Sequence, residues 1–309
     1  MKRLSMAVTI LSCFSTAHVM ALACGDVISS DTTLTADLLD CPANGLTIIA
    51  DYVTLDLNGH TIDGKGSGNG ITIASGLNKV NIVGAGTVKD FYTGIVVNDG
   101  DKHTLNDIRI WGTQQGAYFL NLTKSIVTKL DIIGGVNGIV VDGNSDDNEI
   151  NDNDVTAVSG EAIWVRGGSY NTLSGNYLLD NQTGLTFNGG VKNVFKYNHV
   201  IGNGNGILIS PGYLSSAGDS IKHTIYQNKI YNNHTGIWLN TYSSPDFVIQ
   251  NLIEKNAIFG GAQGLYIDGP NNVDNEISNN YFADQTVFHI QDGGSSTLLN
   301  ANQCNGTPC

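Results

Sequence analysis

A four-residue phrase recurs along this chain: a Gly, then Ile or Leu, then a variable residue, then another large apolar residue. Copies lie at residues 94–97, 138–141, 184–187, 206–209, 236–239 and 264–267, and their spacings correspond to one or two repeats of about 22 residues, with two longer repeats near the C-terminal end. A period in this range is typical of solenoids, in which each repeat packs only against its neighbours. Because the apolar residues alternate with period 2, each copy is predicted to form a β-strand with one buried face.

Alignment on this phrase predicts about ten rungs. The residues expected to point inward are the pairs Ile71/Ile73, Ile95/Val97, Ala117/Phe119, Ile139/Val141, Ile163/Val165, Leu185/Phe187, Ile207/Ile209, Ile237/Leu239, Leu265/Ile267 and Phe288/Ile290. A second short strand is expected in each rung, followed by a row of corner residues, Asn153, Asn176, Asn198, Asn228 and Asn280. Asn tolerates the left-handed conformation of a sharp corner, and stacked amides can hydrogen-bond along the axis.

These patterns predict an all-β fold, a right-handed parallel β-helix, since parallel crossovers favour right-handed coiling. We expect an N-terminal cap and first rung over residues 24–62, the β-helix over residues 63–292, and a C-terminal cap or tail over residues 293–309. Two longer connections, residues 210–219 and 240–246, should leave the coil at the same corner. They mark either a binding face or tolerated surface decoration.

The first 23 residues have the pattern of a secretory signal peptide. Lys2 and Arg3 precede an apolar run, and residues 21–23 read Ala-Leu-Ala, so cleavage is expected after Ala23. This predicts a secreted or periplasmic protein without a transmembrane segment. Four cysteines would remain, and their proximity in sequence favours the disulfides Cys24–Cys41 and Cys304–Cys309. The alternative is a lipoprotein acylated on Cys24.

The charge balance restricts the partners. The net charge of -13, with only 15 Lys and Arg residues, argues against a nucleic-acid partner. It also argues against simple electrostatic capture of an acidic polysaccharide unless a divalent cation bridges the two. Residues 144–154 are rich in Asp and Asn and could bind Ca²⁺, although they lack the spacing of known calcium loops and a solvated turn is the better explanation. We assign no other metal, and we expect a monomer.

Three stretches carry a resemblance to a known family: residues 24–26 (Cys-Gly-Asp), residues 37–42 and residues 53–62, together with the Gly-Ile rungs. With these, the chain resembles exported bacterial right-handed parallel β-helix repeat proteins, a superfamily of carbohydrate-binding and sugar-cleaving domains. The resemblance implies a polysaccharide or cell-surface glycan as partner. The reaction motifs of polygalacturonases, mannuronan epimerases and pectate lyases are absent, apart from an Asp146-Asp147 pair in a turn, so no catalytic role transfers to a residue.

Two outward rows of the repeated strand supply the candidate site. Tyr118, Trp164, Trp238 and Tyr266 could stack on sugar rings, or they could be ordinary sheet surface. In the next outward row, Asn240 and Asp268 are candidate substrate contacts. Asp142, Arg166 and Asn188 follow on consecutive rungs and are the candidate catalytic residues, with Arg166 neutralising negative charge. The alternative is a surface ion pair between Asp142 and Arg166.

These observations predict an exported protein that interacts with a polysaccharide, and one hypothesis is a lyase acting on a uronate-containing chain. A hydrolase is disfavoured because Asp142 and Asp268 should lie ~24 Å apart, beyond the spacing of a carboxyl pair. The base of a lyase would come from His199, His223, His234, Lys192 or Lys196. The alternative is a non-catalytic carbohydrate-binding or envelope structural protein, so the sequence leaves open whether the protein is an enzyme.

Overall fold

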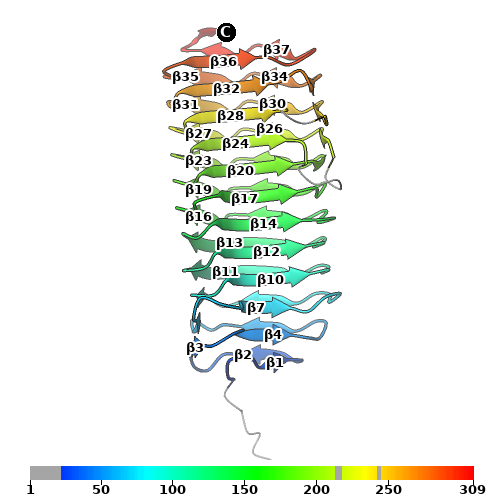
Figure 1. Ribbon diagram of the computed structural model, residues 1–309, viewed down its shortest axis with the longest axis vertical. Coiled ribbons are helices and arrows are strands. Elements are labelled where there is room, and N and C mark those ends of the chain that lie inside the picture. Colours follow the sequence, from blue (N-terminus) through cyan, green and yellow to red (C-terminus); the bar gives the residue numbers. More distant parts are fainter. Residues whose placement is uncertain (1–21, 213–217, 242–244) are drawn as a thin grey trace, which may run out of the picture.

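The computed structural model describes residues 22–212, 218–241 and 245–309. Within these ranges the secondary structure consists of β-strands, and no α-helix is present. Figure 1 shows the strands stacked as rungs of one parallel β-helix along the long axis of the molecule. Residues 1–21, which include almost all of the expected signal peptide, lie outside the described residues. No helix in the described ranges is long and apolar enough to cross a membrane.

One continuous sheet of twelve parallel strands forms one side of the coil, and we call it the front sheet (Figure 1). Its strands are β1 (Val27–Ile28), β4 (Leu46–Ile48), β7 (Asn69–Ile73), β10 (Thr93–Asn98), β12 (Gln115–Leu120), β14 (Asn137–Asp142), β17 (Glu161–Arg166), β20 (Thr183–Asn188), β24 (Asn205–Ser210), β28 (Thr235–Asn240), β32 (Gln263–Asp268) and β36 (Phe288–Asp292).

The rest of each rung belongs to a second sheet, to which most rungs contribute two short strands. Its strands are β2 (Thr32–Thr33), β3 (Leu38–Cys41), β5 (Thr54–Asp56), β6 (Thr61–Gly64), β8 (Asn81–Val83), β9 (Gly86–Lys89), β11 (Thr104–Trp111), β13 (Ile126–Ile133), β15 (Glu149–Asn151), β16 (Asp154–Thr156), β18 (Thr172–Ser174), β19 (Tyr177–Leu179), β22 (Val194–Lys196), β23 (His199–Ile201), β26 (Thr224–Tyr226), β27 (Lys229–Tyr231), β30 (Leu252–Glu254), β31 (Ala257–Phe259), β34 (Glu276–Ser278), β35 (Tyr281–Ala283), β37 (Leu298–Asn300), β38 (Gln303–Cys304) and β39 (Thr307–Pro308).

A small third sheet lies where the longer connections return to the coil. Its strands are β21 (Gly190–Val191), β25 (Ser220–Ile221), β29 (Val248–Ile249) and β33 (Asn272–Val273), and their pairing is parallel.

The predicted all-β parallel β-helix is therefore confirmed, with twelve rungs in place of about ten. The two additional front strands, β1 and β4, lie in residues 24–62, which we had assigned to the cap and first rung. The register of the last rung was wrong by two residues. Ile290, not Phe288, pairs with Leu265, and Phe288 pairs with Gln263.

The core of the coil is the set of predicted inward pairs stacked along the axis. Ile95, Val97, Ala117 and Phe119 are fully buried, as are the corresponding residues of the following rungs through Ile267. The repeated Gly is explained by the close approach of the next rung. A Cβ on Gly94 would lie 2.5 Å from the carbonyl oxygen of Gly116 and 2.6 Å from a methyl carbon of Ile110. The phrase that defines the sequence repeat is thus a packing requirement.

The predicted Asn row is an amide ladder inside one corner. Asn153 Nδ2 donates to Asn176 Oδ1 at 2.9 Å, and Asn176 Nδ2 donates to Asn198 Oδ1 at 2.9 Å. The left-handed residue of the corner is not the Asn, however, but the residue before it, as at Asp152 (φ 54°) and Tyr197 (φ 59°). The amide faces inward, where it satisfies buried backbone groups, and this requirement selects Asn.

Both ends of the coil carry a disulfide. Cys24 is bonded to Cys41 and Cys304 to Cys309, as the sequence predicted. The second bond closes the hairpin of β38 and β39, the one antiparallel pairing among the described strands. Disulfides of this kind indicate an extracytoplasmic protein.

Candidate functional site on the outer face of the front sheet

The outer face of the front sheet carries the side chains that the sequence assigned to the site. Strand pairing places Tyr118 beside Val140 and Trp164 beside Thr186 in one row, which we call the aromatic row. Asp142, Arg166 and Asn188 are successive partners in the next row, which we call the polar row. The structure therefore brings the three candidate catalytic residues together on adjacent rungs.

Asp142 lies at the centre of a compact polar network. Arg166 Nη1 is 3.3 Å from Asp142 Oδ2, and the Tyr118 hydroxyl donates to the same oxygen at 2.9 Å. The backbone N–H of Gly143 donates to Asp142 Oδ1 at 2.8 Å. The side chains of Arg166 and Asp142 are only 27% and 17% exposed. Both charged groups are thus held in fixed positions, and each neutralises the other.

Trp164 is less available for sugar stacking than the sequence suggested. The guanidinium carbon of Arg166 lies over its ring, 4.6 Å from the ring centre. The indole N–H donates to Asn188 Oδ1, and Asn188 Nδ2 donates to Ser210 Oγ. A ligand approaching this part of the face would therefore meet the Arg166–Trp164 pair as one unit.

Tyr118 is a hydrogen-bond donor and not a base. Burial, reinforced by the hydrogen bond to Asp142, raises the pKa of the Tyr118 hydroxyl to about 12. The hydroxyl therefore keeps its proton at any physiological pH. Its hydrogen bond positions the Asp142 carboxylate toward Arg166.

Sequence reasoning missed Glu161, which lies on the same face. In β17, Ala162 takes the place of the repeated Gly, and Ala162 and Ile163 are both buried in the core. Glu161, the residue before them, therefore faces outward. In other rungs this position contacts its outward neighbours, as when Thr235 donates to Gln263 at 2.9 Å. Burial raises the pKa of the Glu161 carboxyl, and the charge of Arg166 partly opposes this rise. The sequence contained a signal for this residue: from β7 to β32 the position before the repeated Gly is Asn, Thr or Gln, and Glu161 is the one acidic residue there.

A second aromatic group lies three rungs further along the aromatic row, ~14 Å from Trp164 by rung spacing. The rings of Trp238 and Tyr266 are nearly parallel, with centres 6.0 Å apart. Phe288, which we had placed inside the coil, is on the outer face with its ring centre 5.8 Å from that of Tyr266. In the polar row Asn240 pairs with Asp268 on the adjacent strand. The candidate sugar contacts thus form two groups and not one continuous platform.

None of the proposed bases reaches Arg166. His223 is buried inside the coil, His199 and Lys196 belong to strands of the second sheet, and His234 and Lys192 are exposed on turns. Asp142 and Asp268 are separated by five strand pairings, as expected. Among the described residues, Glu161 is therefore the carboxyl with a raised pKa on the face that carries Arg166.

The two longer connections follow β24 and β28, so they leave the coil at the carboxyl ends of two strands of the front sheet. Their bases lie side by side, because β25 pairs with β29 and the Phe247 N–H donates to Asp219 Oδ1 at 2.7 Å. Residues 213–217 and 242–244 of these connections lie outside the described residues.

The acidic run over residues 144–154 does not converge on one point. Asn148 is buried in a corner ladder, Asp146 accepts the Ser169 N–H at 2.7 Å, and Asp154 faces outward on the second sheet. Across the ranges that the structure describes, no group of three or more His, Cys, Asp or Glu residues is placed to share a metal ion.

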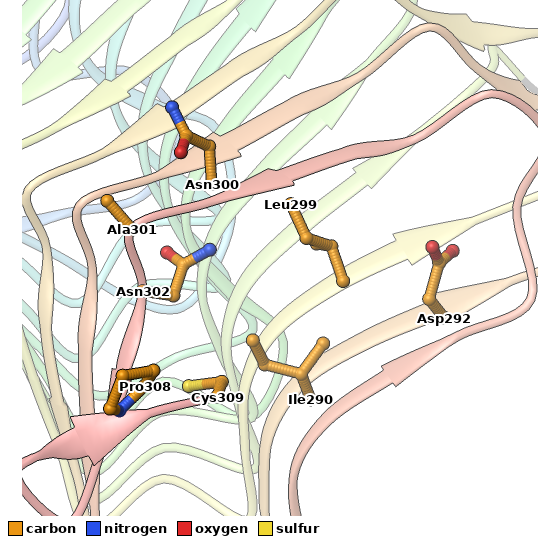
Figure 2. Close-up of a pocket in the computed structure, with 8 residues that line it drawn as sticks. All are labelled: Ile290, Asp292, Leu299, Asn300, Ala301, Asn302, Pro308 and Cys309. Atoms are coloured by element: carbon orange, nitrogen blue, oxygen red, sulfur yellow. The ribbon is translucent and has the colours of Figure 1, made fainter.

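A pocket of about 370 Å³ lies elsewhere, at the C-terminal end of the coil (Figure 2). Ile290 and Leu299 form its apolar wall, Asp292 lies at one side, and Pro308 and Cys309 belong to the terminal hairpin. Its lining has one acidic side chain, Asp292, and no basic side chain. The pocket is the open end of the last rungs and is remote from Arg166, so we place the candidate site on the front sheet.

Comparison with known proteins identifies the family. The model of the family described as "Periplasmic copper-binding protein (NosD)" matches residues 53–216, which is more than half of the chain. The chain belongs to the NosD family. No curated protein matches it. The NosD match covers the rungs that carry Tyr118, Asp142, Glu161, Trp164 and Arg166.

Solved structures similar to this NosD-family chain share its fold at low identity. An exopolygalacturonase from Thermotoga maritima has a TM-score of 0.64 at 10% identity, over 89% of this chain and 84% of that chain. The mannuronan C-5 epimerase A-module of Azotobacter vinelandii has a TM-score of 0.55 at 13% identity, over 90% of each. The Dettilon tailspike protein has a TM-score of 0.60 at 15% identity; the match covers 90% of this chain but only 60% of the tailspike.

Proposed function

We propose that this NosD-family protein is an extracytoplasmic glycan-binding β-helix that holds a polysaccharide along the outer face of its front sheet. The observation that carries the proposal is the network of Tyr118, Asp142, Arg166, Trp164 and Asn188. It combines fixed donors and acceptors with an aromatic ring on one open sheet face, which is the chemistry that recognises a hydroxyl-rich ring. The names of the similar structures, a polygalacturonase and a mannuronan epimerase, support a carbohydrate partner.

The electrostatics favour binding over catalysis. Arg166 is neutralised by Asp142, and the Asp142 oxygens already accept from Tyr118 and Gly143. Neither side chain is therefore free to take a proton or to stabilise a new charge without breaking this network. A neutral, hydroxyl-rich chain fits such a site better than a polyuronate does, because the site offers both donors and acceptors but little net charge.

A lyase acting on a uronate-containing chain is the second candidate, and Glu161 is the residue that favours it. Its carboxyl has a raised pKa and shares the outer face with Arg166. β-Elimination requires a base close to a group that neutralises the uronate carboxylate. In this version, the substrate carboxylate would displace Asp142 from Arg166 and Glu161 would accept the C5 proton. The C4–O4 bond would break as the C4=C5 double bond forms, and the departing oxygen would take a proton from water.

The copper named in the family description does not fit the donor set of this chain. Copper sites use thiolate, thioether or imidazole ligands. All four cysteines from Cys24 onward are in disulfides, and the three methionines, Met1, Met6 and Met20, precede the described residues. No described group of three ligands converges. We therefore assign no copper-dependent step to the β-helix.

We also propose export to the periplasm or outside the cell after removal of residues 1–23. The disulfides and the periplasmic description of the family support this location. Acylation of Cys24 is incompatible with its bond to Cys41, since both need the same sulfur atom.

The test is a panel of neutral and uronate polysaccharides, read both for retention of the protein and for ultraviolet absorbance of unsaturated products. The proposal expects retention without product, and it expects Arg166→Ala to lose that retention. Arg109→Ala is a matched control, because Arg109 forms an ion pair of the same 3.3 Å length with Asp131 on the second sheet. Product that Arg166→Ala and Glu161→Gln both abolish would establish the lyase. No retention and no product would reject both functions.

A further inference from the structure

A column of apolar side chains runs along the outside of the second sheet, away from the front sheet. Strand pairing stacks its members one per rung, and they are Trp111, Ile133, Thr156, Leu179, Ile201, Tyr231, Phe259 and Ala283, of which Thr156 alone is polar. Each lies next to a buried residue of its own strand, such as Leu178 or Val200, so the column faces outward. Trp111 is 39% exposed. We call this set the apolar column.

The apolar column extends over eight rungs and is interrupted at Thr156 alone, whereas single exposed apolar residues are normal on a protein surface. Its rings contact one another, with the centres of Tyr231 and Phe259 5.3 Å apart. By rung spacing the column is ~34 Å long. A stripe of this length marks an interaction surface.

A parallel column two residues earlier on each strand carries charge. Its members in rung order are Arg109, Asp131, Asp154, Tyr177, His199, Lys229, Ala257 and Tyr281. Arg109 and Asp131 neutralise each other within the chain at 3.3 Å. Asp154 and Lys229 are exposed, three rungs apart, and form no ion pair among the described residues. Acid and base are therefore separated along one face.

We propose that this face binds a second copy of the same chain in an antiparallel, two-fold symmetric dimer. A two-fold axis parallel to the strands, passing between the rungs of Leu179 and Ile201, reverses the order of each column and lays it on itself. Leu179 then faces Ile201 of the second copy, and Ile133 faces Phe259. The apolar column is thereby covered along its whole length.

The same operation pairs the charges. Asp154 of one copy faces Lys229 of the other, and this contact occurs twice. Tyr177 faces His199, a pairing whose edge-to-face geometry already occurs within the chain at 6.1 Å. At the two ends, the large Trp111 side chain faces the rung of Ala283, which is the smallest member of the column and is only 5% exposed. This self-complementarity in polarity, charge and size is the argument for a second copy as the occupant.

The available area is sufficient for association. A face ~34 Å long and about 20 Å wide, including the flanking turns, would bury roughly 700 Å² per partner, close to the ~800 Å² of a standard interface. The front sheet lies on another side of the coil, so dimerisation leaves the Arg166 face open. The inference is independent of the proposed glycan function, and it replaces our initial expectation of a monomer.

The test is sedimentation velocity of the complete exported chain over a range of concentrations, with charge-swapped variants. The wild type is expected to sediment as a dimer. Asp154→Lys places Lys opposite Lys229 twice, and Lys229→Asp places Asp opposite Asp154 twice. Each should weaken dimerisation about a hundredfold, because like charges facing each other across an interface cost several kcal/mol. The double variant restores opposite charges and should dimerise again.

Lys222→Asp is the control, because Lys222 is an exposed lysine on a different corner of the coil, and it should leave the dimer unchanged. Thermal unfolding of each variant establishes that the fold is intact; Asp154→Lys gains Asp131 as a neighbour on the adjacent rung. A wild type that stays monomeric at the highest concentration would overturn the proposal. So would dimerisation that the single swaps leave intact. If the wild type is monomeric and Asp154→Lys or Lys229→Asp loses glycan retention, the face would be reassigned to a ligand.

Discussion

The imidazole of His223 stacks on the phenyl ring of Phe187 inside the coil, with the ring centres 4.7 Å apart and the planes 17° from parallel. His223 occupies a position that Asn fills in the neighbouring rungs. Its Nδ1 accepts the backbone N–H of Asn193 at 3.1 Å, and the backbone N–H of His223 donates to Asn251 Oδ1 at 2.8 Å. The imidazole thus replaces the Asn side chain as an acceptor for a backbone N–H, but it places a titratable group in the core.

This burial predicts acid sensitivity. Desolvation lowers the pKa of His223 to about 3, against the small opposing effect of the Gly189 carbonyl. Below pH ~6.5, His223 is protonated in the unfolded chain but stays neutral in the folded chain. The free energy of unfolding should therefore fall by about 1.4 kcal/mol per pH unit as the pH approaches 3. His223→Asn should flatten this dependence in urea unfolding measured from pH 7 to pH 4. The exposed His234→Asn serves as control, and an unchanged slope in His223→Asn would refute the assignment.

Asn176 supports two rungs at once, so its loss should be costly. Its Oδ1 accepts from the N–H and the amide of Asn153, and its Nδ2 donates to the Ile150 carbonyl at 2.9 Å. Asn176→Ala leaves several of these buried groups unpaired, at ~1–3 kcal/mol each. We expect a loss of about 3 kcal/mol or more in chemical unfolding, compared with well under 1 kcal/mol for the exposed Asn144→Ala. Equal effects at the two positions would contradict the ladder.

Asp142 sets the charge preference of the site. Asp142→Asn keeps the shape of the side chain and leaves an uncompensated positive charge on Arg166. Binding of uronate polymers should therefore strengthen, on the order of tenfold at low salt, while binding of neutral polymers should change little or weaken. Affinity electrophoresis with both polymer types measures this. Asp131→Asn provides the matched control on the second sheet, and a uniform loss for both polymers would show that Asp142 contacts the glycan directly.

Copper should not bind tightly to the exported chain. Its soft ligands are either in disulfides or in residues 1–20. After incubation with Cu²⁺ and passage over a chelating resin, we expect far less than one copper per chain by elemental analysis. Reduction of the disulfides should increase copper uptake, because it frees four thiols. Stoichiometric copper on the oxidised protein would show that the family description applies to this chain.

Much of the fold followed from the sequence because steric demands recur in every rung. Gly94 and its equivalents leave room for no more than a very small side chain, and the position is Gly in every front strand from β7 to β32 except β17, where it is Ala162. The Gly-Ile phrase therefore predicted the strand register, and with it the rows of Trp164 and Arg166. The last rung has no such Gly. Phe288 and Ile290 are both apolar and two residues apart, so period 2 alone could not distinguish them. β4 carries the phrase as Gly45-Leu46-Thr47-Ile48, and a Cβ on Gly45 would lie 2.2 Å from the Gly70 carbonyl oxygen, so this rung was predictable and was overlooked. In β1, Asp26 stands where the phrase has Ile or Leu.

The candidate site was predictable in its rows but not in its contacts. Strand period placed Asp142 and Arg166 on adjacent rungs, and the ion pair follows from that spacing. Whether Arg166 covers Trp164 depends on side-chain torsions that no repeat specifies. Glu161 was missed because two consecutive inward residues, Ala162 and Ile163, break the simple alternation.

The amide ladder has a consequence for how mutations accumulate in this molecule. Each ladder Asn forms hydrogen bonds only with the rungs directly above and below it. A change at one corner therefore affects the adjacent rungs and not those further along the coil. Whole rungs can therefore be duplicated or lost without disturbing distant ones. Each such event would move the Trp238 group toward or away from Trp164 by one rung, ~4.8 Å. The spacing between the two aromatic groups, and with it the length of glycan that could span them, can change in discrete steps while the fold stays the same.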